Sequence, residues 1–344
     1  MKKIILFLSF LILIQTEFAF AQNQDYDFNL DEFEKKSFDC RGYLSLNPKI
    51  TVDNKEQRLY SAINELQIEP SYKKDWINLK ANFSFFAMLY SKEDNDYKFI
   101  INNLYQTFGE DFSLSLGKQS LKWGKGYIYN PIAFLDRVKN PLDPESVREG
   151  YYLLKLQYIQ TPEGDILQNH SFTFVYMPSS YDLNKDFYTK EHSYNNVAFK
   201  YYALILDTDI DLIYMQEEKV NKYGIDLSKN LSEELEVHGE LSYFNEQNEY
   251  LIGFKYAAPY DLTLTTEYYK KQGDNFIYNK LSQKDAFGII YSTAYVSYQK
   301  NLDQNKYQVI FSFKYDFKNG FVVESIATKS SQDKSLGLKT TYYF

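Results

Sequence analysis

The sequence predicts an all-β fold, a transmembrane antiparallel up-and-down β-barrel of about 18 strands with one long loop folded into the lumen. Three observations predict it. The chain opens with a segment typical of export, and most of the rest alternates apolar and polar residues with a period of two. The chain is also 18% aromatic although its mean hydropathy is −0.48. In a barrel, polar lumen-facing residues dilute the lipid-facing ones, and aromatic residues gather at the membrane interfaces.

The export segment comes first. Lys2 and Lys3 precede an apolar run over 4–14, and Ala19-Phe20-Ala21 matches the small-x-small pattern of a signal-peptide cleavage site. The run is shorter than the ~20 residues of a membrane-spanning helix. We therefore expect a signal peptide over 1–21, with an uncleaved N-terminal anchor as the alternative.

Residues 22–40 are acidic and lack the period of two. We expect a periplasmic N-terminal tail there, or a small plug that enters the pore. The chain has a single cysteine, Cys40, which excludes an internal disulfide.

The barrel is expected over 41–344. In 112–119, for example, Phe112, Leu114 and Leu116 alternate with small or polar residues, as lipid on one face and water on the other require. The predicted strands are 42–52, 58–68, 76–90, 97–108, 112–119, 151–160, 171–177, 196–206, 210–217, 223–231, 235–244, 250–257, 262–269, 307–317, 321–328 and 336–344.

Connection lengths decide the strand number. A barrel with both ends in the periplasm needs an even number of strands, short periplasmic turns and longer outer loops. The long connections are 91–96, 120–150, 178–195 and 270–285, and they alternate with short ones such as 109–111 and 318–320; 161–170 fits this scheme worst. The alternation holds to the end only if 286–300 is two strands that turn at Ser292-Thr293. That gives 18 strands, with 16 as the alternative.

The last strand carries a second signal. Leu336, Leu338, Thr340, Tyr342 and Phe344 share one face, and the chain ends on that face with an aromatic residue. This ending resembles the signal read by the barrel-assembly machinery, so we expect Phe344 to be an assembly signal and that machinery and outer-membrane lipid to be partners. A soluble solenoid would show an internal repeat, and none is found. A sandwich would need a larger apolar core and more turn residues than 14 Gly and 8 Pro.

The stretch 117–150 is expected to be a constriction loop. Pro131, Pro141 and Pro144 exclude regular strand, and the loop is longer than the ~12–15 residues beyond which loops are usually functional or disordered. Its aromatic and aliphatic residues are too apolar for a solvated outer loop, so we expect them to pack against the inner barrel wall; an ordered outer loop is the alternative. The expected constriction residues are Gln119, Trp123, Lys125, Tyr129, Asp136, Arg137, Lys139, Asp143, Glu145, Arg148 and Glu149.

Strand alternation also predicts charged residues on the inner wall. Two interpretations remain open, a mutually neutralising network and a solute path with a basic side facing an acidic side. Lys118 falls on the lipid side, where it must snorkel or be redirected by a β-bulge. The expected wall residues are Lys200, Glu236, His238, Glu240, Lys255, Glu267, Lys314, Asp316 and Lys339.

The order of short motifs in this loop resembles a known signature. The motifs are Gly-Lys-Gln at 117–119, Trp-Gly-Lys-Gly at 123–126, Tyr-Asn-Pro at 129–131, Asn-Pro-Leu-Asp-Pro-Glu at 140–145 and Arg-Glu-Gly at 148–150. They resemble the loop of large bacterial outer-membrane porin-like barrels, and alginate-export-like barrels carry a related version. The resemblance implies a pore-forming barrel with a loop in the lumen. Lys118 stands where Arg is usual and Tyr129 where Trp is common, so the resemblance does not extend to the solute.

These features favour a porin-like channel in the bacterial outer membrane for passive diffusion of small hydrophilic solutes. The alternative is a structural or complex-forming barrel, such as a polymer export conduit or a sheath around a periplasmic partner. A net charge of −8 argues against nucleic-acid binding. A homo-oligomer is left open.

No catalytic set is visible in the sequence. We find neither a Ser-His-Asp set nor a Gly-x-Ser-x-Gly elbow, and we expect no enzyme, cofactor or metal site. His238 lies between Glu236 and Glu240, but side chains two apart on a strand are separated by about 7 Å, which is loose for a shared metal.

Overall fold

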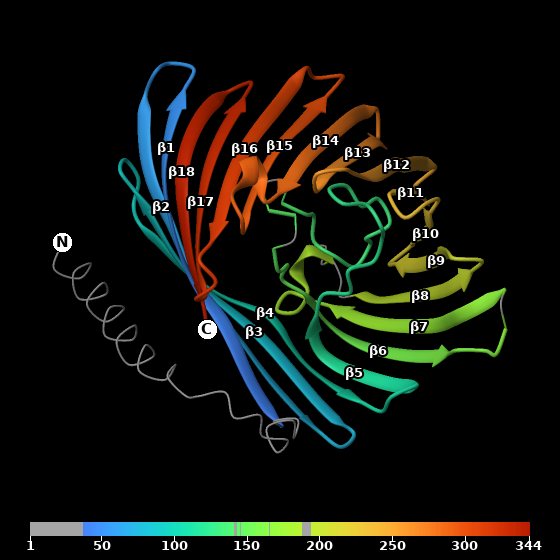
Figure 1. Cartoon of the computed structure of the whole chain (residues 1–344). Helices are drawn as coiled ribbons and strands as arrows, with labels where there is room; N and C mark the ends of the chain where they lie inside the picture. Colours follow the sequence, from blue (N-terminus) through green and yellow to red (C-terminus); the bar gives the residue numbers. More distant parts are fainter. Residues whose placement is uncertain (1–36, 141–142, 145, 165, 188–193) are drawn as a thin grey trace, which may run out of the picture. The chain divides into compact units, whose positions relative to one another are not determined.

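The computed structural model describes residues 37–140, 143–144, 146–164, 166–187 and 194–344 (Figure 1). The predicted signal peptide and most of the N-terminal tail lie outside these residues. The strands are β1 (Phe38–Asp53), β2 (Arg58–Lys74), β3 (Ile77–Tyr90), β4 (Asp96–Phe108), β5 (Phe112–Gln119), β6 (Tyr151–Gln160), β7 (Leu167–Ser179), β8 (Tyr194–Ile205), β9 (Thr208–Glu217), β10 (Val220–Asn230), β11 (Leu235–Phe244), β12 (Gln247–Ala258), β13 (Leu262–Lys271), β14 (Asp274–Lys284), β15 (Ser292–Asn301), β16 (Lys306–Asp316), β17 (Phe321–Ser330) and β18 (Asp333–Tyr343). Two short 3-10 turns, η3 (Lys185–Phe187) and η4 (Ala286–Gly288), lie between strands.

Each strand pairs antiparallel with its sequence neighbours, and β1 also pairs with β18, so the sheet closes into an 18-stranded barrel. The predicted fold class and strand number are confirmed. β1 begins at Phe38, three residues before the predicted start of the barrel at 41. Among the described residues, no helix is long and apolar enough to cross a membrane.

The route to 18 strands differs from the predicted one near the C-terminus. The stretch 270–285 was expected to be an outer loop, but it contains β14, and 286–300 holds only one strand, β15. β14 was missed because it breaks the apolar-out, polar-in pattern. Tyr278 is buried on the inner face, whereas Asn279 pairs with outward-facing residues. The chain then turns through left-handed positions, with φ of 45° at Asp285 and 58° at Phe287.

Alternation along the strands separates the two faces of the barrel. Leu116, Phe172 and Ile252 are exposed on the outside, whereas Ser84 and Ser115 are almost completely buried on the inside. Side chains of successive strand residues point to opposite faces, so an apolar outer surface and a polar inner one follow directly from the period of two.

The ends of the strand series meet at one seam. Gly42 of β1 donates a backbone hydrogen bond to the carbonyl oxygen of Phe344, and Phe344 donates one back, each at 3.0 Å. A Cβ at Gly42 would lie 2.7 Å from the Phe344 ring, so this contact requires glycine. The terminal residue therefore closes the barrel between β18 and β1.

Candidate functional site

The 31-residue connection between β5 and β6 lies inside the barrel, where Figure 1 shows it as the green trace in the lumen. Both of its ends are tied to β4. The Ser120 amide donates to Asn103 Oδ1 at 3.0 Å, and the Gly150 amide donates to the Asn102 carbonyl at 2.8 Å. A Cβ at Gly150 would come within 2.6 Å of the Ser120 nitrogen, so the two ends approach closely only because residue 150 is glycine.

One face of the loop is anchored by apolar packing. Trp123, Ile132 and Leu135 are buried in a cluster with inward-facing residues of β6 to β9. Full burial of such side chains stabilises by about 1.5–3 kcal/mol each relative to exposure. The expected packing of the loop on the inner wall is thereby confirmed. The wall residues of the cluster are Tyr151, Leu153, Val175, Met177, Ala198, Ile213 and Met215.

Asp136 ties the first turn of the loop together. Its carboxylate accepts hydrogen bonds from the Ser120 hydroxyl at 2.7 Å, the Leu121 amide at 3.1 Å and the Trp123 amide at 2.9 Å. Arg148 Nη2 lies 3.9 Å from the same carboxylate. Asp136 therefore has a local structural role and is not available to a solute.

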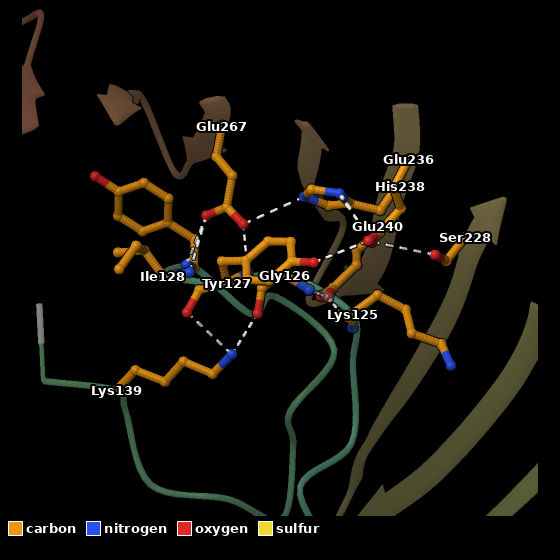
Figure 2. A network of polar contacts seen from close by, with 11 residues as sticks. Lys125, Gly126, Tyr127, Ile128, Lys139, Ser228, Glu236, His238, Glu240 and Glu267 are labelled. Carbon is orange, nitrogen blue, oxygen red and sulfur yellow. Dashed lines mark hydrogen bonds and ion pairs between the residues drawn. The ribbon is translucent and has the colours of Figure 1, made fainter. Parts of the chain in front are cut away.

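Two wall carboxylates hold the middle of the loop, as Figure 2 shows. Glu240 of β11 accepts the backbone amides of Lys125 and Gly126, both at 2.6 Å. Glu267 of β13 accepts the amides of Tyr127, of Ile128 at 3.0 Å and of Tyr129 at 3.2 Å. Hydrogen bonds from backbone N–H to an ionised carboxylate are stronger than neutral ones. A run of five consecutive amides is thus fixed to the barrel wall.

The ring of Tyr127 is held on the same wall. Its hydroxyl donates to Glu236 Oε2 at 2.9 Å, its ring meets His238 edge to face at 5.3 Å, and Lys255 Nζ lies 5.2 Å from its centroid. His238 Nε2 is 3.2 Å from Glu267 Oε1. Among the described residues, no three His, Cys, Asp or Glu side chains are arranged to hold a metal ion.

Tyr129 connects the loop to β13, β14 and β15. Its ring stacks on Tyr269 at 4.9 Å and contacts Phe276 at 5.7 Å, and its hydroxyl accepts a hydrogen bond from Gln299 Nε2 at 2.8 Å. Burial raises the pKa of the Tyr129 phenol above its usual range. The hydroxyl is therefore a neutral group at ordinary pH.

A second connection, between β7 and β8, contributes to the same assembly. Arg137 pairs with Asp186 of η3 and donates through Nε to the Glu149 carbonyl at 3.2 Å. Asp186 also accepts the Tyr151 hydroxyl at 3.0 Å, and Phe187 packs against the apolar cluster. No sequence pattern predicted this contact, because 178–195 was expected to be an outer loop.

Other predicted constriction residues occupy distinct places. Lys139 donates to the carbonyls of Gly126 and Tyr127, within the loop. Asp143 lies 3.7 Å from Lys339 of β18, across the lumen from the apolar cluster. Gln119 is buried at the end of β5, and Glu145 lies outside the described residues.

Neither of the two expectations for Lys118, snorkelling or redirection by a β-bulge, describes its position alone. It lies opposite Leu104 and Tyr152, at an outward-facing position as predicted. Its side chain is nevertheless buried, with Nζ 2.6 Å from Glu149 Oε1 and 5.4 Å from the Tyr152 ring. Gly117, with φ of 127°, precedes it, and an ion pair takes the place of contact with lipid.

Three more predicted wall residues belong to local arrangements. Lys200 pairs with Asp211 of β9 at 2.8 Å. Asp316 is exposed at the end of β16 and accepts the Lys318 amide at 2.7 Å, so it caps a turn. Lys314 is partly exposed, and no ion pair involves it among the described residues.

The sequence reasoning missed several inward-facing groups. Asp211 and Asp226 face each other on β9 and β10 and are fully buried, and neither Asp226 oxygen has a hydrogen-bond partner among the described residues. Lys155 was also missed because it lies on β6, a mostly apolar strand. Lys280 was missed because it lies on β14, which was not predicted as a strand. The apolar residues at inward positions of β6 to β9 could have predicted the packed loop, because a water-filled lumen does not require apolar side chains there.

A closed barrel with an apolar outer face, a polar inner face and a loop packed inside defines the class of bacterial outer-membrane β-barrels. Three solved Pseudomonas aeruginosa structures are similar in fold. OpdQ matches with a TM-score of 0.58 and 8% identity over 90% of this chain and 99% of its own. OprD matches with a TM-score of 0.55 and 11% identity over 89% of this chain and 95% of its own. The outer membrane protein opdK matches with a TM-score of 0.55 and 10% identity over 89% of this chain and 99% of its own.

These identities establish similarity of fold. No family model and no curated protein sequence matches this chain. The resemblance of the 117–150 loop to alginate-export-like barrels stays a prediction.

Proposed function

We propose that this protein is an outer-membrane channel through which small hydrophilic solutes diffuse passively. The observation that carries the proposal is the loop in the lumen, fixed to the wall by Glu240 and Glu267. An 18-stranded barrel is wide enough for an aqueous lumen, and a loop fastened inside it narrows that lumen. Selectivity in such pores follows from the charged side chains that line the narrow part.

Burial in the lumen withdraws more carboxylates than lysines from solvent, while Glu65, Glu69, Glu236 and Glu324 remain partly exposed. The lumen's most deeply buried carboxylates are at most 4% exposed, measured over the residue in five cases and over the side chain for Asp136. In contrast, inward-facing lysines such as Lys155, Lys255, Lys314 and Lys339 remain partly exposed. We therefore propose a preference for anionic over cationic solutes of equal size. The buried carboxylates are Asp136, Asp211, Asp226, Glu240, Glu249 and Glu267.

The test is single-channel recording of the refolded chain 22–344 in a planar bilayer, with reversal potentials in a salt gradient. We expect steady ohmic steps and a reversal potential on the anion-selective side. Deletion of 125–145 should raise the conductance, because it removes the segment that narrows the lumen. Deletion of 92–95, in the exposed β3–β4 connection, is the matched control and should change little.

Two outcomes would refute parts of this proposal. A folded barrel that conducts no ions would favour a structural or complex-forming barrel, and co-purification would then be used to find its partner. An open pore whose conductance is unchanged by the 125–145 deletion would refute the role of the loop as the constriction.

A further inference from the structure

Val138 is an exception within the loop. It is 93% exposed, whereas the apolar residues Trp123, Ile132 and Leu135 of the same loop are at most 5% exposed. A single exposed apolar side chain needs no explanation on an ordinary surface. The position of Val138 inside the barrel, between two anchored neighbours, makes it informative.

The residues on either side of Val138 are fixed. The Arg137 guanidinium is bound to the Glu149 carbonyl and to Asp186, and the Lys139 ammonium is bound to the carbonyls of Gly126 and Tyr127. Both long side chains fold back onto the docked part of the loop. The intervening isopropyl group therefore cannot be withdrawn from water by a small backbone movement.

The contacts that dock the loop on the wall involve residues other than Val138. The loop packs against β6 to β9 through the apolar cluster and against β11 and β13 through Glu240 and Glu267. Beyond Val138, Asp143 comes near Lys339 on β18. Val138 thus lies in the portion of the loop that leaves the docked wall and extends towards the opposite one.

We infer that Val138 faces the solute passage and is a specificity-determining residue of the channel. This inference rests on the proposed channel function. At this position the loop presents an apolar contact to passing solutes, and its own nearest cations are engaged elsewhere. A charge introduced at residue 138 should act on permeating ions directly, because the fixed neighbours leave it no route out of the passage.

The test uses a single cysteine. On a Cys40→Ser background, Val138→Cys is treated during recording with an anionic and, separately, a cationic methanethiosulfonate reagent. We expect both to lower the conductance and to shift the reversal potential in opposite directions, the anionic adduct towards cations and the cationic adduct towards anions. Glu93→Cys, in the exposed β3–β4 connection, should be modified equally with no change in current.

Each other outcome overturns the inference. A cysteine at 138 that does not react would place the side chain away from the water-filled passage. A cysteine that reacts without changing the current would place it in water but outside the ion path. Absence of current from the unmodified wild-type barrel would instead show that the proposed channel function is wrong, so the two failures are distinguishable.

Discussion

Glu267→Gln is the substitution that most directly tests how the loop is held. In the wild-type barrel, Glu267 Oε1 accepts the Tyr127 amide and faces His238, and Oε2 accepts the amides of Ile128 and Tyr129. Glutamine has the same shape but only one acceptor oxygen, so its NH₂ group faces either the Tyr127 amide or the amides of Ile128 and Tyr129. Hydrogen bonds to charged groups contribute about 1.5–3 kcal/mol each, so the loss of one or two weakens docking by about 1.5–6 kcal/mol.

That loss has a measurable consequence. Since about 1.4 kcal/mol corresponds to a factor of ten, opening of the loop should become about 10–10⁴-fold more frequent. Hydrogen–deuterium exchange of a peptide that covers 125–130 should speed up by this order, because exchange reports local opening. Glu249→Gln is the matched control, since Glu249 is also buried and, among the described residues, accepts only the Tyr269 hydroxyl. Unchanged exchange over 125–130 in Glu267→Gln would refute the assignment of Glu267 as an anchor.

Three further predictions address the apolar anchor, the lumen charge and the C-terminus. Ile132→Ala should weaken loop docking by about 2–5 kcal/mol and expose the loop to proteolysis, whereas Ile252→Ala on the outer face should leave cleavage unchanged. Lys314→Glu should move the reversal potential towards cations and Lys329→Glu, on the outer face, should not; equal shifts would show a surface effect only. Deletion of Phe344 should reduce the yield of heat-modifiable folded barrel in cells, because the Gly42 seam contact is lost, and a normal yield would contradict its role in assembly.

The sequence predicted the wall better than it predicted what the wall contacts. Glu240, Glu267 and His238 were placed on the inner face from strand alternation alone, and the structure has them there. Their partners were expected to be other charged side chains. His238 does lie beside Glu267, but both glutamates bind backbone amides of the loop. No pattern of side-chain types encodes which N–H groups of a 31-residue connection will meet which carboxylate.

Misplacement of β14 shows where alternation fails. The rule requires an apolar outer face, but a lumen that contains a packed loop also accepts large aromatic residues inside. Tyr278 is such a residue and is 3% exposed. On the neighbouring strand β13, the outward-facing Thr266 hydroxyl donates to Asn279 at 3.0 Å. This hydrogen bond satisfies the Asn279 side-chain oxygen on the outer face. These two local exceptions were enough to hide a strand of 11 residues.

The binding of wall carboxylates to loop amides also affects the charge that the lumen presents to a solute. A chain with net charge −8 would be expected to favour cations if its lumen simply reflected its composition. Carboxylates that accept loop amides are shielded from solvent, and the N–H dipoles aimed at them offset part of their charge. Lys155 and Lys314 are partly exposed and have no ion-pair partner among the described residues, whereas Lys339 lies 3.7 Å from Asp143. In the proposed channel the loop narrows the passage and covers carboxylates of the wall, so release of the loop by Glu267→Gln should shift the reversal potential towards cations as conductance rises.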